Sequence, residues 1–104
     1  MPSTDPSVPD APLDPDALDD ALAARFGGDD GERRVVVRQA TDLADAGKHR
    51  RDRGHPLTVE EVLSNLADAP AGSSLVDRWN WWMGALEVAY GGYEPFQVRR
   101  FRRE

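Results

Sequence analysis

The three tryptophans of this chain fall within four consecutive residues, 79–82, and no other feature constrains the fold as strongly. At about 100° per residue, a helix over this segment gathers one broad apolar face. Two indole rings on that face are large enough to dominate the core of a small domain. We therefore predict a core-facing helix that Ser74 caps and Gly91-Gly92 ends. The residues on its apolar face are Leu75, Trp79, Trp82, Met83, Leu86 and Tyr90.

Trp81 does not share this face, because helical geometry projects it to the opposite side, near Val88 and beside Ala85. Three interpretations stay open. An N-terminal helix could cover Trp81, the side chain could anchor a subunit or partner interface, or it could stack on a base or another planar ligand. Gly84 costs about 1 kcal/mol relative to alanine in a helix interior, which indicates close packing on this side as well.

Two further helices are predicted from their end signals. Residues 14–27 form a short amphipathic helix, with Asp14 as its cap and glycine at its end. Residues 57–69 give the clearest local pattern, because Thr58 and Glu61 stand in capping-box relation before an apolar stripe. Glu61 falls on the opposite, polar face of that helix, where we expect it to be solvated.

Residues 33–47 fit two structures. Val35, Val36 and Val37 form a β-branched run that could open a strand. Val36, Ala40 and Leu43 nevertheless share one face at helical spacing, so a helix is favoured. The basic stretch 48–55 that follows is interpreted as a solvated loop.

The C-terminal segment 93–101 shows a period of two, in which Phe96 and Val98 alternate with polar residues. This pattern predicts a strand, which needs a partner that residues 35–37 or another molecule would supply. The predicted fold is therefore mainly α: a small three- to four-helix domain with a short C-terminal β-strand, preceded by a disordered acidic N-terminal segment. The expected divisions are a leader at 1–13, the helix at 14–27, and a single domain at 33–104 with an arginine-rich tail.

Charge is distributed unevenly along the chain. Residues 1–32 hold nine acids and one arginine, whereas residues 33–104 hold ten acids and twelve basic residues. Among the 13 basic residues only Lys48 is a lysine, and the sequence pI is about 4.8. Abundant aspartate with scarce lysine is typical of halophilic microbes, although a GC-rich actinobacterial source would also favour arginine.

Little in the sequence indicates catalysis or a cofactor. Cysteine is absent, which excludes disulfides and thiolate sites. His49 and His55 are the two histidines, and their spacing matches no standard zinc pattern and brings no evident third ligand. No hydrolase or phosphate-binding motif is present. We therefore predict a protein without enzymatic activity, metal, cofactor or small-molecule substrate. With no signal peptide or membrane-spanning run, a cytoplasmic location is expected.

Two functions remain. The first is a non-enzymatic protein-interaction module or small complex subunit, a homodimer included, that docks through Trp81, Val88, Phe96 and Val98. The alternative is a small nucleic-acid-associated protein that resembles a helix-turn-helix protein in the order of its helices. Its phosphate-binding residues would be two arginine clusters, Arg50, Arg51 and Arg53, and Arg99, Arg100, Arg102 and Arg103.

Overall fold

A computed structural model describes residues 13–99, and within this range the chain is helical. The helices are α1 (Pro15–Phe26), α2 (Asp30–Ala46), α3 (Lys48–Arg53), α4 (Val59–Ala67) and α5 (Leu75–Tyr90), followed by the 3-10 turn η2 (Glu94–Phe96). The predicted mainly α class is confirmed. None of the helices in the described range is long and apolar enough to cross a bilayer. The cytoplasmic location stays a prediction.

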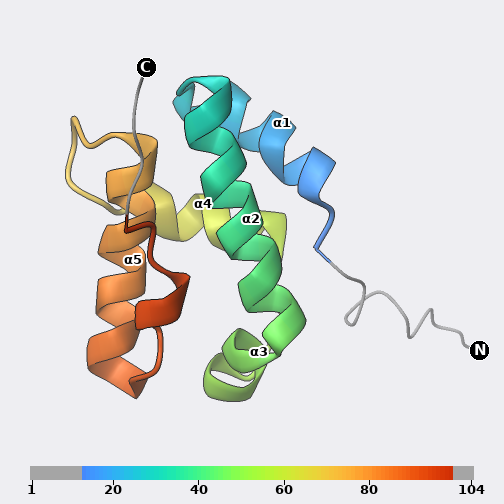
Figure 1. The fold of residues 1–104 in the computed structure, drawn as a ribbon, viewed down its shortest axis with the longest axis vertical. Coiled ribbons are helices and arrows are strands. Elements are labelled where there is room, and N and C mark those ends of the chain that lie inside the picture. Colours follow the sequence, from blue (N-terminus) through green and yellow to red (C-terminus); the bar gives the residue numbers. More distant parts are fainter. Residues whose placement is uncertain (1–12, 100–104) are drawn as a thin grey trace, which may run out of the picture.

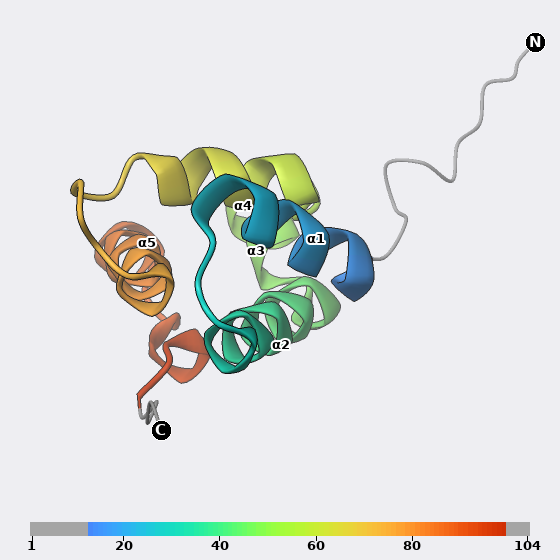
Figure 2. The same cartoon turned by 90° about the horizontal axis from the view of Figure 1, so that it is seen from above.

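The longer helices surround one core (Figures 1 and 2). Helix α2 packs against α1 and α5, while α4 packs against α1 and α5 from the other side. The segment that contains η2 lies between α2 and α5, and α3 continues from the far end of α2. The predicted core face of α5 is confirmed for Leu75, Trp79, Trp82, Met83 and Leu86, whereas Tyr90 is 46% exposed.

The first helix, α1, belongs to this core. Leu18 and Leu22 of α1 are fully buried, and Leu13 before the helix is also buried. The expected domain boundary at residue 33 is therefore too late. The segment between α1 and α2 contains the N-cap of α2, because the Asp29 carboxylate accepts the Glu32 N–H at 2.7 Å. Residues 1–12 of the predicted disordered leader lie outside the described range.

The ambiguous segment 33–47 is helical, as favoured. Val36, Ala40 and Leu43 point into the core from α2 and are fully buried. Their helical spacing therefore decides the structure over the β-branched run, since burial of a continuous face outweighs a small local propensity.

The predicted C-terminal strand is absent from residues 93–99. Pro95 instead lies in the 3-10 turn η2. The proline ring fixes its φ angle at a value that suits a helical turn. Beyond η2, Val98 pairs with a side chain of α5 instead of a second strand. The alternating pattern reflects burial of Val98 and partial burial of Phe96, and residues 100 and 101 of the expected strand lie outside the described range.

A buried carboxylate joins the start of α2 to the start of α5. Glu32 is 3% exposed, and its Oε2 accepts the Val76 N–H at 3.0 Å from 44 residues away. The first N–H groups of a helix lack intrahelical partners and carry partial positive charge. Glu32 therefore supplements the cap that Ser74 provides through the Asp77 N–H at 3.1 Å.

We expect Glu32→Ala to lower the free energy of unfolding by about 1–3 kcal/mol, because the Val76 N–H would be left buried without an acceptor. Glu32→Gln, which keeps an acceptor oxygen, should cost less. Urea unfolding measures both. Asp42→Ala, at an exposed position of the same helix, should stay within about 0.5 kcal/mol of the original protein. Equal stability of the Glu32→Ala and Asp42→Ala variants would show that the cap contributes nothing.

Candidate functional site

Trp79 and Trp82 form the centre of the core. Trp79 is fully buried and Trp82 is 2% exposed, and their rings meet edge to face with centroids 5.5 Å apart. The Trp79 Nε1–H also donates to the Phe96 carbonyl at 2.8 Å. One indole ring thus fills the core and holds the backbone of η2 against α5.

Asn80 takes the place of a neighbouring strand for Val98. Its Nδ2 donates to the Val98 carbonyl at 2.9 Å, and its Oδ1 accepts the Val98 N–H at 2.8 Å. Both backbone polar groups of a half-buried segment are therefore satisfied by one primary amide. Among the twenty standard side chains only Asn and Gln carry a primary amide, and Asn is the shorter.

Trp81 points away from this assembly. It is 42% exposed and Val88 is 89% exposed, although both are large apolar side chains. Helix α1 packs on α2 and α4, so the interpretation in which it covers Trp81 is wrong. A Cβ built on Gly84 would meet nothing within 4 Å, so the close packing expected at this glycine does not occur within the described part of the chain.

The residues 79–82 read WNWW in one-letter code, and a comparison with family models matches residues 2–87 to the WNWW domain. The chain belongs to the WNWW domain family. No curated protein and no solved structure matches it. Three of the four residues that spell the name have a role within this WNWW domain. Trp79, Asn80 and Trp82 contact the core or the C-terminal segment. Trp81 is the exception.

The other two residues predicted to contact a partner lie inside the domain. Val98 is 8% exposed, and Phe96 packs against the core with its carbonyl bound by Trp79. The structure therefore separates Phe96 and Val98 from Trp81 and Val88, which sequence reasoning had grouped together. The two pairs differ in the one property that matters for docking, the exposure of the side chain.

The arginines are less free than the sequence indicates. Arg53 lies 3.6 Å from Glu61, and Arg99 lies 3.8 Å from Glu94. Arg50 and Arg51 are exposed on α3. Arg100, Arg102 and Arg103 lie outside the described range. Helix α3 also stands between α2 and α4, so these two helices are not joined by the short turn of a helix-turn-helix motif.

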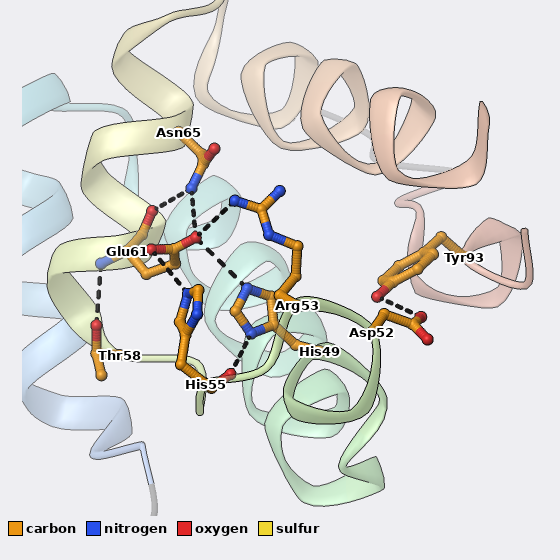
Figure 3. Close-up of polar contacts among 8 residues, drawn as sticks. All are labelled: His49, Asp52, Arg53, His55, Thr58, Glu61, Asn65 and Tyr93. Carbon is orange, nitrogen blue, oxygen red and sulfur yellow. Dashed lines mark hydrogen bonds and ion pairs between the residues drawn. The ribbon is translucent and has the colours of Figure 1, made fainter. Parts of the chain in front are cut away.

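Residues Lys48–Arg53 of the basic stretch form the short helix α3 instead of the predicted loop, and the stretch brings both histidines to one carboxylate (Figure 3). His49 is 1% exposed, and its Nε2 lies 3.5 Å from Glu61 Oε2. His55 Nε2, just after the glycine that ends α3, lies 3.4 Å from Glu61 Oε1. The predicted solvation of His49 and Glu61 is therefore wrong, because the loop after α3 folds this helix back onto the start of α4.

Local hydrogen bonds fix the orientation of Glu61. The Thr58 hydroxyl accepts the Glu61 N–H at 3.1 Å, which confirms one half of the predicted capping box. The Glu61 carboxylate does not return to the Thr58 backbone but accepts from Asn65 Nδ2 at 3.1 Å. Although burial opposes its ionisation, hydrogen bonds from Asn65 and His55 hold the pKa of Glu61 below its usual value.

The protonation of His49 follows from its contacts. Its Nδ1 lies 3.0 Å from the His55 carbonyl oxygen, which can only accept, so Nδ1 carries a proton. Burial lowers the pKa of His49, which keeps the ring neutral at pH 7 and leaves a lone pair on Nε2. No hydrogen bond reaches this buried Nε2. A buried imidazole lone pair without a donor requires an explanation.

A second polar cluster joins the other side of α3 to the C-terminal segment. The Tyr93 hydroxyl donates to Asp52 Oδ2 at 2.9 Å, and Lys48 Nζ donates to the same oxygen at 2.9 Å (Figure 3 shows the tyrosine contact). Lys48 also lies over the Tyr93 ring, 4.5 Å from its centroid. The hydrogen bond from Lys48 lowers the pKa of Asp52, and burial raises the pKa of the Tyr93 phenol. This network, which we call the Asp52–Tyr93 joint, holds α3 against the C-terminal segment.

Sequence reasoning missed Glu61 as a companion of the two histidines. The signal that could have found it is the even spacing of His49, His55 and Glu61, each six residues after the one before. This spacing corresponds to no single helical face, so it gains meaning only once the chain is known to turn between α3 and α4.

We expect Asn80→Ala to lower the free energy of unfolding by about 1–3 kcal/mol and to speed hydrogen exchange at the Val98 amide, because that amide loses its acceptor. Asn80→Asp is the sharper variant. Its oxygens can still accept the Val98 N–H, but the carboxylate then faces the Val98 carbonyl without a donor. Both variants should be destabilised in urea; unchanged stability of both would contradict the assigned role.

Proposed function

We propose that this WNWW domain is a non-enzymatic interaction module that docks through the exposed face of α5, and that its partner there is a second copy of the chain. The observation that carries the proposal is the exposure of Trp81 beside Val88, on a helix whose opposite face is buried. Trp is enriched among the residues that anchor protein interfaces. A small domain also has little core of its own, so an apolar partner surface adds stability.

Between Trp81 and Val88 this face carries no charged side chain, and the exposed Asp77 lies one turn before Trp81 on the same side. At about 100° per residue, Trp81, Gly84, Ala85 and Val88 project within roughly 100° of one another, away from the core. Gly84 and Ala85 are small, and a Cβ at Gly84 would stand in open space. Large apolar side chains thus flank a shallow centre, which lets another helix approach closely.

The same face is complementary to itself, and this is why a second copy fits. The midpoint between Trp81 and Val88 falls between Gly84 and Ala85. In an antiparallel pair of α5 helices with a two-fold axis at this midpoint, Trp81 meets the partner's Val88 and Gly84 meets the partner's Ala85. An isologous interface requires each patch to carry both halves of every contact, and this stripe does.

The nucleic-acid alternative receives less support. Arg53 and Arg99 lie near carboxylates of the same chain, Glu61 and Glu94. Glu60 of α4 and Asp68, the residue that caps its end, are exposed and would repel phosphate. The arginines therefore favour intramolecular ion pairs and solvation over a phosphate-binding surface.

Light scattering coupled to size exclusion tests the proposal. We expect a mass near twice the 11.5 kDa of the chain at high concentration, and a mass near that of one chain for Trp81→Ala, because the anchor is lost. Tyr90→Ala is the matched control, since Tyr90 is 46% exposed but projects about 180° from Trp81 around the helix. A single-chain mass for the original protein at every concentration would overturn self-association.

Gly84→Gln separates docking from folding. Because Gly84 has open space around it in the chain, a good helix former there should raise the stability of the monomer by up to about 1 kcal/mol. The longer side chain should at the same time keep two helices apart and weaken the dimer. A variant that is more stable and still fully dimeric would contradict the close approach at this glycine.

A further inference from the structure

The histidine–carboxylate cluster between α3 and α4 has the arrangement of a metal-ligand set. One ligand atom each from His49, His55 and Glu61 can be chosen so that all three lie within 4.8 Å of one another. The His49–Glu61 and His55–Glu61 atom pairs are 3.5 Å and 3.4 Å apart. Ligands about 2.0–2.1 Å from a tetrahedral ion stand roughly 3.3–3.5 Å from each other. The two contacts run to different oxygens of the Glu61 carboxylate, and each separation is close to one edge of a tetrahedral zinc site.

Hydrogen bonds around the cluster orient the ring of His49 and the carboxylate of Glu61. The His55 carbonyl holds the His49 ring through Nδ1, so that Nε2 faces Glu61 with its lone pair. Asn65 holds the Glu61 carboxylate from the other side. In metal sites the second ring nitrogen of a histidine ligand is commonly bound to a backbone carbonyl or carboxylate in this way.

We propose that His49, His55 and Glu61 bind a divalent first-row metal ion, for which Zn²⁺ is the best fit. Two imidazoles and one carboxylate suit this ion, and no thiolate is needed. The buried Nε2 of His49 has no hydrogen-bond partner, and its lone pair would coordinate the ion. His55 is about half exposed, with 47% of its side chain accessible, so water can complete the coordination.

Arg53 is the competitor for this site. Its guanidinium lies 3.6 Å from Glu61 Oε2, the oxygen that also faces His49. Two cations cannot share this carboxylate without mutual repulsion, so the metal ion displaces the arginine. The Arg53 side chain is 33% exposed, and rotation into solvent leaves no charge buried. Arg53 therefore lowers the affinity of the site for the metal ion.

The bound ion would clamp α3 to α4 across the loop that joins them. His49 lies in α3, His55 follows Gly54 at its end, and Glu61 lies in the first turn of α4. A ligand that binds the folded state alone raises its stability by mass action. The expected role is thus structural, on the side of α3 that the Asp52–Tyr93 joint does not hold.

Isothermal titration of the full chain, free of any polyhistidine tag, with Zn²⁺ tests the proposal. We expect one equivalent to bind and the melting temperature to rise. Co²⁺ should give the visible d–d bands of a tetrahedral site. His55→Ala and Glu61→Gln should each lower the affinity by more than the roughly 10–100-fold that loss of an outer-shell contact costs. Arg53→Ala should raise it several-fold, a change that nonspecific binding to surface acids would not produce.

Glu60→Gln is the matched control, because Glu60 is an exposed carboxylate next to Glu61 in the same helical turn. It should bind Zn²⁺ as the original protein does. His55→Ala alters a half-exposed side chain, and circular dichroism verifies its fold. The proposal would be overturned if the original protein failed to bind one equivalent of Zn²⁺. It would also be overturned if folded His55→Ala and Glu61→Gln bound Zn²⁺ as tightly as the original protein.

Discussion

Three hydrogen bonds from two adjacent residues of α5 hold the C-terminal segment of the described chain, and the rest of the domain is arranged around them. Trp79 binds the carbonyl of Phe96, and Asn80 binds both backbone groups of Val98. This attachment keeps Tyr93 buried, where its hydroxyl reaches Asp52 of α3. Without these two side chains, the Phe96 carbonyl and both backbone groups of Val98 would lose these partners. Leaving a buried polar group unpaired costs more free energy than a typical hydrogen bond contributes. Helix α5 therefore supplies the centre of the core and also holds the C-terminal segment in place.

How much could be predicted depends on how local each signal is. The caps of α1, α4 and α5 were predictable because Asp14, Thr58 and Ser74 bind N–H groups two or three residues ahead. The strand was not, because alternation at Phe96 and Val98 reports which side is buried and cannot tell whether the partner is a strand or the side chain of Asn80. Glu32 reaches Val76 across 44 residues, and His49 meets Glu61 only because the chain turns at Gly54. Contacts of this kind need the fold first.

The four residues 79–82 have different roles because they project in different directions around α5. Trp79 and Trp82 are buried, Asn80 lies at the edge of the core, and Trp81 points to solvent on the far side. In this chain Trp79, Asn80 and Trp82 thus each contribute to the fold of one molecule. Trp81 has no such role within the described part of the chain, and under the proposed function it contacts a second copy, with Gly84 and Ala85 beside it on α5.

The most direct test of this division is fluorine NMR of protein labelled with 5-fluorotryptophan, which gives one resonance for each of the three indoles. The account predicts that two resonances stay constant over a dilution series, while the third, assigned by Trp81→Phe, shifts or broadens as the protein self-associates. The solvent-isotope shift of that third resonance should be the largest in the dilute sample, because Trp81 is the exposed ring. Three resonances that are all independent of concentration, or a Trp81 resonance shielded from solvent in the monomer, would contradict it.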